Sequence, residues 1–203
     1  MTERRTQAER RAESRQRLID AAIQLLGERG YARTSLVEIG KAAGLSRGLV
    51  SHHFGSKEAC MQAVVAAIRT SARAQLRTAD VHGVAALDRL FDVYFGGVRD
   101  HDANARAMYV ILVEGLTATP GLRPAVAETN ALTRASIAEA VRAAAAADGP
   151  AIDAEAAAVL IEGILRGVAL QYLAAPDAVD LDGAVTLAKR LVRTLLLTEL
   201  PTG

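Results

Sequence analysis

Side chains suited to contact with nucleic acid gather in one stretch of the chain, TSLVEIGKAAGLSRGLVSHHFGSK, which runs from Thr34 to Lys57. Arg47 can donate two hydrogen bonds to atoms O6 and N7 of a guanine, a pairing worth about 1–3 kcal/mol of discrimination against other bases. Lys57 can pair with a phosphate, and it lies near the expected start of a helix, where the helix dipole also favours anions. The segment therefore predicts a nucleic-acid-binding site.

Two short helices are expected to position these side chains. The first begins near Ser35, because the letters SLVE have the capping-box pattern, in which the hydroxyl and the carboxylate each accept a bond from a free amide. The second begins after Ser46 and ends before Gly55, and Gly44 lies in the turn between them, where a positive φ is needed. This order is typical of a helix-turn-helix, whose second helix enters the major groove.

The segment resembles the TetR family of one-component regulators, and its Ser-His-x-Phe variant is similar to the BetI repressors. The resemblance is strong from about Arg15 to Val65. The matching residues are Gly30, Thr34, Ser35, Ile39, Ala43, Gly44, Leu45, Ser46, Gly48, Val50, His53, Phe54, Ser56, Lys57 and Glu58. Two positions depart from the family pattern: Ser51 replaces a tyrosine, and Gly40 replaces an alanine. A glycine within a helix costs up to about 1 kcal/mol against alanine, so we expect close packing at Gly40.

The matched positions and their chemistry predict two kinds of DNA contact. Arg47, Gly48, Leu49 and Ser51 are expected to approach base edges, and His52 to face outward beside them. Phosphate contacts are expected from the remaining four candidates. The full set of predicted DNA-binding residues is Thr34, Ser35, Arg47, Gly48, Leu49, Ser51, His52, His53 and Lys57. Arginines of the N-terminal segment, such as Arg10, Arg11 and Arg15, are expected to reach the DNA backbone or the minor groove.

The composition favours helices throughout. Hydrophobic residues make up 51% of the 203 residues and aromatic residues only 3%, so the core must be built from Ala, Leu, Val and Ile. No alternating pattern bounded by hairpin turns predicts a strand. The expected fold is all-α: a three-helix helix-turn-helix DNA-binding domain followed by a helical ligand-binding and dimerisation domain, with about nine helices. Beyond residue 80, helices are expected near residues 84–99, 103–117, 122–147, 153–174 and 182–199.

Charge is distributed unevenly between the two expected domains. Residues 1–57, the predicted N-terminal arm and helix-turn-helix domain, hold 11 basic and 6 acidic residues, whereas residues 58–203, the predicted effector-binding and dimerisation domain, hold 13 and 17. A basic N-terminal domain joined to a mildly acidic second domain favours contact between the N-terminal domain and a polyanion.

The arm, residues 1–13, is expected to be flexible and to merge into the first helix. The domain boundary is expected to lie within the fourth helix.

Three partners are predicted. The first is a double-stranded DNA operator, expected to be palindromic, because a short recognition helix contacts few base pairs and two copies are needed. The second is another copy of the chain, docked through the last two helices, whose apolar stripes include Ala156, Ala157, Leu160, Ile164, Val168, Leu187, Leu191 and Leu195. The third, implied by the family resemblance, is an unknown small-molecule effector. Its candidate contacts are Tyr94, Met108, Tyr109, Asn130, Arg134, Gln171 and Tyr172.

Other interpretations have less support from the residues. His52–His53 could bind a metal, but no further His or Cys lies at suitable spacing. Asp100-His101-Asp102 also has metal-ligand chemistry, but it lies at an expected helix junction, where caps and solvated turns are usual. We expect no metal, no cofactor and no catalytic residues. Cys60 is expected to be a small buried residue. No apolar run long and uncharged enough to span a membrane and no secretory signal are found, so we expect a cytoplasmic protein without membrane contact. Three alternatives remain. The protein could be an activator or an architectural DNA-binding protein, or an enzyme whose site is assembled by the fold. It could also be a helical ligand-binding protein whose N-terminal domain no longer binds DNA.

Overall fold

The computed structural model of the chain is helical throughout the residues that it describes, which are 6–77, 81–145 and 152–197. Within these ranges it has nine α-helices and two short 3-10 helices, so the predicted all-α class is confirmed. The elements are α1 (Gln7–Arg29), α2 (Leu36–Ala42), α3 (Arg47–Phe54), α4 (Lys57–Leu76), α5 (Gly83–Arg99), α6 (Ala103–Leu116), η1 (Pro120–Leu122), α7 (Arg123–Ala145), α8 (Ala154–Ala174), η2 (Pro176–Ala178) and α9 (Leu181–Leu197). The predicted ends at residues 147 and 199, and residues 1–5, fall outside the described ranges.

Helix α1 begins earlier than the sequence analysis expected. Thr6 and Glu9 form a complete capping box: the Glu9 backbone N–H donates to Oγ1 of Thr6 over 3.2 Å, and the Thr6 backbone N–H donates to Oε2 of Glu9 over 2.7 Å. These two bonds satisfy amides that otherwise lack a partner at a helix start. The predicted flexible arm is therefore wrong from Gln7 onward, and Arg10, Arg11 and Arg15 lie on a helix.

The chain packs as two compact units. The first contains residues 1–70 and 102–127, and the second contains residues 71–101 and 128–203. The division falls inside α4 and again inside α7, so neither of these helices belongs to one unit alone. These units describe packing. The predicted division by function, into a DNA-binding domain up to residue 57 and an effector-binding domain from residue 58, stays a prediction.

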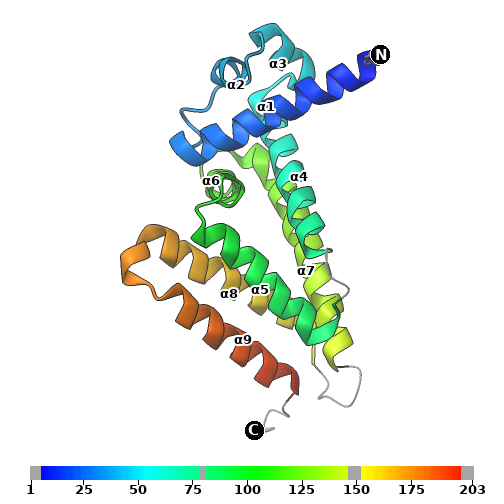
Figure 1. Cartoon of the computed structure of the whole chain (residues 1–203), viewed down its shortest axis with the longest axis vertical. Helices are drawn as coiled ribbons and strands as arrows, with labels where there is room; N and C mark the ends of the chain where they lie inside the picture. The colour runs from blue at the N-terminus through cyan, green and yellow to red at the C-terminus, as the bar shows by residue number, and fades with distance from the viewer. Residues whose placement is uncertain (1–5, 78–80, 146–151, 198–203) are drawn as a thin grey trace, which may run out of the picture. The chain divides into compact units, whose positions relative to one another are not determined.

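The first unit is held together by an aliphatic core. Helix α1 packs against α2 and α6, and α2 packs against α3 (Figure 1). Leu18 and Leu26 of α1, Ile39 of α2, Met61 of α4 and Ile111 of α6 are all fully buried in this core. The large apolar face of α1 follows the helical spacing seen in the sequence. This core fixes α2 and α3, which carry the predicted DNA contacts.

The second unit is built around α5, α8 and α9, with α5 in contact with both of the others (Figure 1). Phe91 and Phe95 of α5 are buried, as are Ile161 and Leu165 of α8 and Val192 of α9. Three ion pairs run along the α5–α9 contact, joining Asp88 to Arg193, Asp92 to Lys189 and Arg99 to Asp182. Because these pairs are largely exposed, they contribute little to stability beside the apolar core.

Helix α8 is long and apolar enough to cross a membrane when judged by length and composition alone. The core helix of a soluble protein passes the same test. A third of the apolar window is buried inside the chain, and the helix carries an ion-paired carboxylate, Glu162, which is only 7% exposed.

Candidate nucleic-acid interface

Helices α2 and α3 form the helix-turn-helix that the sequence predicted. Gly44 in the turn has φ +65°, a conformation that residues with a Cβ rarely adopt. Ser46 caps α3, since its side chain accepts a bond from the Leu49 backbone N–H over 3.3 Å. Val50 is fully buried and anchors α3. A recognition helix held in this way presents its other face to the solvent.

The two helices approach closely at Gly40. A Cβ atom added there would lie 2.9 Å from Cγ2 of Val50 and 3.1 Å from the carbonyl oxygen of Leu45. Both distances are shorter than ordinary van der Waals contact. The close packing expected at Gly40 is therefore confirmed.

The cap of α2 is only half of the predicted capping box. The Ser35 side chain accepts from the Glu38 backbone N–H over 3.2 Å. The reciprocal bond predicted for the Glu38 carboxylate is wrong, because Oε2 of Glu38 lies instead 3.6 Å from a guanidinium nitrogen of Arg29 on α1. Glu38 thus ties α2 to α1, and Ser35 alone caps the helix.

The exposed face of α3 carries four of the predicted residues. Arg47, Gly48, Ser51 and His52 are exposed, and Leu49 is half-buried. Arg47 and Ser51 are four residues apart and lie on one side of the helix, and Gly48 and His52 are paired in the same way on the neighbouring strip, so the four positions form one broad exposed face. Gly48 has space around it, because the nearest atom to an added Cβ would be Oγ of Ser46 at 3.9 Å. This face combines hydrogen-bond donors with room for close approach, as major-groove contact requires.

The predicted phosphate contacts are less freely exposed. Thr34 is fully buried, and its hydroxyl donates to the carbonyl of Gly30 over 2.8 Å. His53 is half-buried, and its Nε2 atom lies 2.8 Å from Oγ of Ser14 on α1. Burial lowers the pKa of His53, and the nearby His52, Arg11 and Arg15 lower it further. The neutral imidazole therefore dominates at neutral pH, and the DNA contacts assigned to Thr34 and His53 stay predictions.

Lys57, the first residue of α4, has an anchored side chain. Its ammonium donates to the Tyr31 carbonyl over 2.6 Å and lies 3.7 Å from the centre of the Tyr31 ring. Burial lowers the pKa of Lys57, and the carboxylate of Glu114 partly opposes that shift. The lysine motif was visible in the sequence, but its partner Tyr31 belongs to the α1–α2 connection and was not identified.

Sequence analysis also missed a brace of the turn. Arg17 of α1 donates from its guanidinium to the carbonyl of Ala43, which is the C-cap of α2. On the same helix, the Arg15 guanidinium lies 5.4 Å from the centre of the Phe54 ring at the end of α3. Helix α1 therefore steadies the turn and the C-terminal end of the helix-turn-helix. No local signal marks these arginines, because their partners lie 26 and 39 residues away.

The seven candidate effector contacts are divided between the units, with Met108 and Tyr109 in the first and the other five in the second, and their role stays a prediction. Asn130 and Arg134 belong to a polar cluster between α7 and α8, where Arg134 pairs with Glu162 over 2.9 Å and Arg166 donates to Asn130 over 2.6 Å. Arg166 also pairs with Glu162 over 2.8 Å. Two further candidates contact other rings: Tyr94 meets Phe95 edge to face, and Tyr172 stacks on His101. Gln171 is exposed, and Met108 packs against the core of the first unit.

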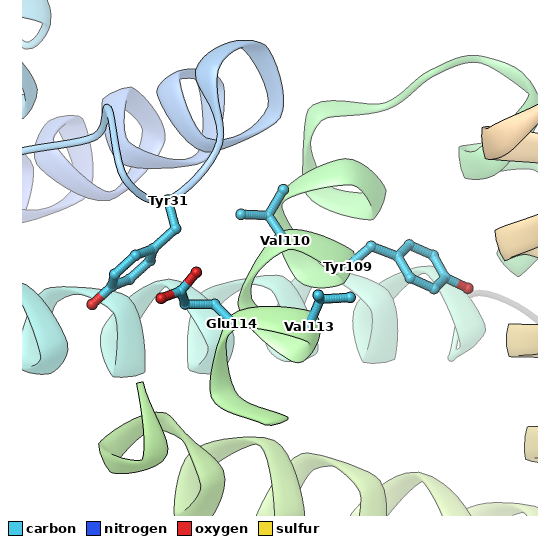
Figure 2. Close-up of a pocket in the computed structure, with 5 residues that line it drawn as sticks. All are labelled: Tyr31, Tyr109, Val110, Val113 and Glu114. Atoms are coloured by element: carbon cyan, nitrogen blue, oxygen red, sulfur yellow. The ribbon is translucent and has the colours of Figure 1, made fainter. Parts of the chain in front are cut away.

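Tyr109 alone among these candidates lines a surface hollow in the first unit. The hollow has a volume of about 370 Å³ and is wide open to solvent; its walls are formed by Tyr31, Tyr109, Val110, Val113 and Glu114 (Figure 2). Tyr31 and Glu114 lie side by side although they come from different elements, the α1–α2 connection and α6 (Figure 2). The pKa of Tyr31 is raised, first by burial and also by the carboxylates of Glu58 and Glu114, while a hydrogen bond with Thr119 lowers it.

Together, a helix-turn-helix with an exposed polar recognition face and a separate helical unit define a DNA-binding protein of the one-component regulator class. Two sequence profiles agree with this class. The profile of bacterial regulatory proteins of the tetR family matches residues 18–64, and the profile of the C-terminal domain of BetI-type transcriptional repressors matches residues 83–197. The chain belongs to the TetR family, and the protein is a ligand-responsive, sequence-specific DNA-binding transcriptional regulator.

Individual relatives support the same assignment along most of the chain. The HTH-type transcriptional regulator TtgR of Pseudomonas putida is 30% identical over 194 residues, which cover 90% of each protein. A TetR-family regulator from Rhodococcus sp. has the same fold, with a TM-score of 0.80 at 20% identity over 92% of this chain and all of that one. The SmeT–triclosan complex aligns with a TM-score of 0.73 at 22% identity, over 94% of this chain and all of SmeT.

Proposed function

We propose that the protein is a homodimeric repressor that binds a palindromic operator and is released from it by a small molecule. The observation that carries this proposal is the exposed face of α3, with Arg47, Ser51 and His52 on a helix whose opposite side is anchored by the buried Val50. Such a face fits the major groove, where each base pair shows a distinct pattern of donors and acceptors. The protein would act in the cytoplasm, where the operator is.

The α3 residues divide by role. Arg47 reads a guanine, Gly48 lets the backbone approach the groove, and Leu49 contacts a thymine methyl group. Ser51 adds a weak contact to either strand. Phosphate contacts from Ser35, His53 and Lys57 set the register on the duplex without reading sequence. The Thr34 hydroxyl donates to the Gly30 carbonyl, so Thr34 would act by holding the start of α2 in place.

Dimerisation through α8 and α9 is supported by an exposed apolar face on these two helices. Leu160 of α8 is 61% exposed, and Leu187 and Leu191 of α9 are 55% and 56% exposed. Gly163 and Gly167 have no atom within 4 Å of an added Cβ, so a second helix can approach α8 closely. Ala157 is removed from the predicted interface, because it is buried inside its own subunit.

The effector is proposed to act from the part of the chain after residue 57 by a population shift. It would bind more tightly to a conformation in which the two recognition helices of the dimer no longer match adjacent major grooves. Ligand binding by the related fold of the SmeT–triclosan complex supports this proposal.

Selection of bound sequences from a random DNA pool, at roughly physiological salt, tests the proposal. Enrichment of a palindrome is expected, with half-sites about one helical turn apart or somewhat more. Arg47→Ala is expected to relax the selected sequence at one position of each half-site while binding to random DNA changes little. Binding that is uniform across sequences and steeply salt-dependent would contradict the operator proposal and indicate an architectural DNA-binding protein.

A further inference from the structure

Lys57 is held at two points by a residue that no sequence motif connects to it. One of its three ammonium N–H groups donates to the Tyr31 carbonyl over 2.6 Å, and the ammonium lies over the Tyr31 ring at 3.7 Å. A lysine side chain on a helix surface ordinarily samples many rotamers, and ordering it costs entropy. Tyr31 makes that ordering a property of the protein before DNA binds, and at least one N–H group is left for another acceptor.

Tyr31 is itself held by the segment that follows α6. The Thr119 hydroxyl donates to Oε1 of Glu114 over 2.7 Å, and the Thr119 backbone N–H donates to the Glu114 carbonyl over 2.9 Å. Thr119 also forms a hydrogen bond with the Tyr31 side chain. The end of α6 is thus joined to the α1–α2 connection through one threonine and one carboxylate.

The same segment packs closely on the first turn of α4. A Cβ atom on Gly121 would lie 2.5 Å from Oε2 of Glu58, so the Glu58 side chain lies directly against the turn after α6. The Gln62 side chain donates to the Gly121 carbonyl over 3.5 Å. Lys57 therefore sits at a junction of three elements, namely the α1–α2 connection, the start of α4 and the end of α6.

The position of Lys57 suits a phosphate contact. The first amides of a helix have no carbonyl partner within the helix, and the N-terminal end of α4 carries the positive end of its dipole. Burial lowers the pKa of Lys57, and the nearby carboxylate of Glu114 partly offsets this by favouring the charged form. An ammonium that is already ordered at the N-terminal end of a helix needs little reorganisation to bind an oxyanion.

We propose that Tyr31 is a positioning residue that holds the Lys57 ammonium for an operator phosphate, and that Glu114 and Thr119 hold Tyr31 in place. This inference rests on the proposed DNA-binding function and adds to it three residues outside the helix-turn-helix motif. Tyr31, Glu114 and Thr119 touch no base in this scheme and act only through Lys57. A residue that acts in this way changes affinity on every DNA sequence alike, because phosphate contacts carry no sequence information.

The test is a double-mutant cycle on the full-length dimer, measured by fluorescence anisotropy with a selected operator and with random duplex DNA across a salt series. Lys57→Ala is expected to reduce the magnitude of the slope of log K against log salt by about 0.9 for each phosphate that the lysine neutralises. Tyr31→Leu removes the ring beneath the ammonium and is expected to weaken binding about threefold to tenfold on both DNAs. In the Lys57→Ala background, the same Tyr31→Leu change is expected to cost less than about twofold.

Two further variants separate positioning from simple folding effects. Tyr31→Phe keeps the ring and the carbonyl but loses the hydrogen bond with Thr119, so its affinity is expected to lie between those of the wild type and Tyr31→Leu, close to that of Thr119→Val. Thr119→Val removes the hydroxyl that contacts Tyr31 and Glu114, and it is expected to lower affinity in the same direction as Tyr31→Leu, by a smaller factor, with no change of sequence preference. Thermal melting of each variant shows that the dimer remains folded.

Each outcome decides the inference. If Tyr31→Leu leaves affinity unchanged, or if its effect is the same with and without Lys57, the positioning role is wrong while DNA binding by the protein stands. A decrease in affinity confined to the selected operator would also contradict the role, because it would indicate distortion of the recognition helix. Failure of the wild type to bind DNA at all would overturn the proposed function together with this inference.

Discussion

Gly40 and Val50 lie so close that a Cβ atom on Gly40 would come within 2.9 Å of Cγ2 of Val50. Val50 is fully buried, and Gly40 belongs to the helix that braces α3. This pair sets how closely the two helices of the helix-turn-helix approach each other. The orientation of the recognition face depends on that approach.

Gly40→Ala is expected to lower the free energy of unfolding by about 1–3 kcal/mol, because the added methyl group overpacks the contact with a branched side chain that has little freedom to move. Urea unfolding followed by circular dichroism measures the change. The matched control is Gly48→Ala on exposed α3, where an added Cβ has its nearest neighbour at 3.9 Å. That control is expected to be as stable as the wild type or up to about 1 kcal/mol more stable. Equal stability of Gly40→Ala and the wild type would show that α2 and α3 separate without cost.

Leu160 and Leu191 are expected to be central to the dimer. Both are more than half exposed on the second unit, and a carboxylate placed at both positions would be buried without a partner in a dimer interface. The double variant Leu160→Glu/Leu191→Glu is therefore expected to sediment as a monomer at micromolar concentration, where the wild type is expected to sediment as a dimer. Val37→Glu, at a 46% exposed apolar position on α2, is the control and should remain a dimer. A double variant that stays dimeric would place the interface elsewhere.

Cys60 is expected to react slowly with thiol reagents in the folded protein. It is fully buried, which confirms its predicted place as a small core residue, and burial raises the pKa of its thiol to about 12. The thiolate is the reactive form, so few molecules are reactive at pH about 8. Ellman's reagent should label the thiol slowly in buffer and rapidly in urea. Fast labelling without urea would mean that the first unit opens readily around α4.

His53 is expected to make stability depend on pH. Burial lowers its pKa in the folded protein, while in the unfolded chain it titrates near 6.5. Between those two values the unfolded chain binds more protons, so the free energy of unfolding rises with pH in this window. The contribution is complete above about pH 6.5 and is lost as the pH falls toward the lowered value. Urea unfolding at several pH values measures it.

His53→Gln should flatten that part of the pH profile, because glutamine does not titrate. Operator DNA is expected to have the opposite effect from burial, since a nearby phosphate favours the charged imidazole. DNA affinity should then rise as the pH falls below about 6.5, and more so in the wild type than in His53→Gln. A stability profile that is identical in the two proteins would assign the pH dependence to other groups.

Much of the helix-turn-helix could be predicted from the sequence, because its signals are local. Gly44 and Ser46 mark the turn and the start of α3 within three residues of each other, and both act there as expected. The helical spacing of apolar residues in α1 predicted its buried face. Thr6 and Glu9 carry an equally local capping signal, and the expected flexible arm was wrong because these two bonds outweigh the polar composition of the segment.

Other features were decided by tertiary structure alone. The SLVE capping pattern predicted a bond from Glu38 back to its own helix, but Arg29 of α1 is close enough to compete for the carboxylate. Whether a stripe of leucines is core or surface depends on which helix covers it, so Ala157 is buried while Leu160, three residues later, is exposed. Sequence periodicity describes a helix face but does not identify its partner.

Residue types and short-range spacing were thus sufficient for the fold class, the recognition helix and the lysine at the start of α4. The partner of that lysine was not, because Tyr31, Glu114 and Thr119 come from segments separated by more than 80 residues and meet only after α1, α4 and α6 pack on a common core. Capping and turn formation depend on atoms a few bonds apart along the chain. Contacts such as the one between Lys57 and Tyr31 depend instead on the distance between side chains in space, and this distance is determined by how the helices pack.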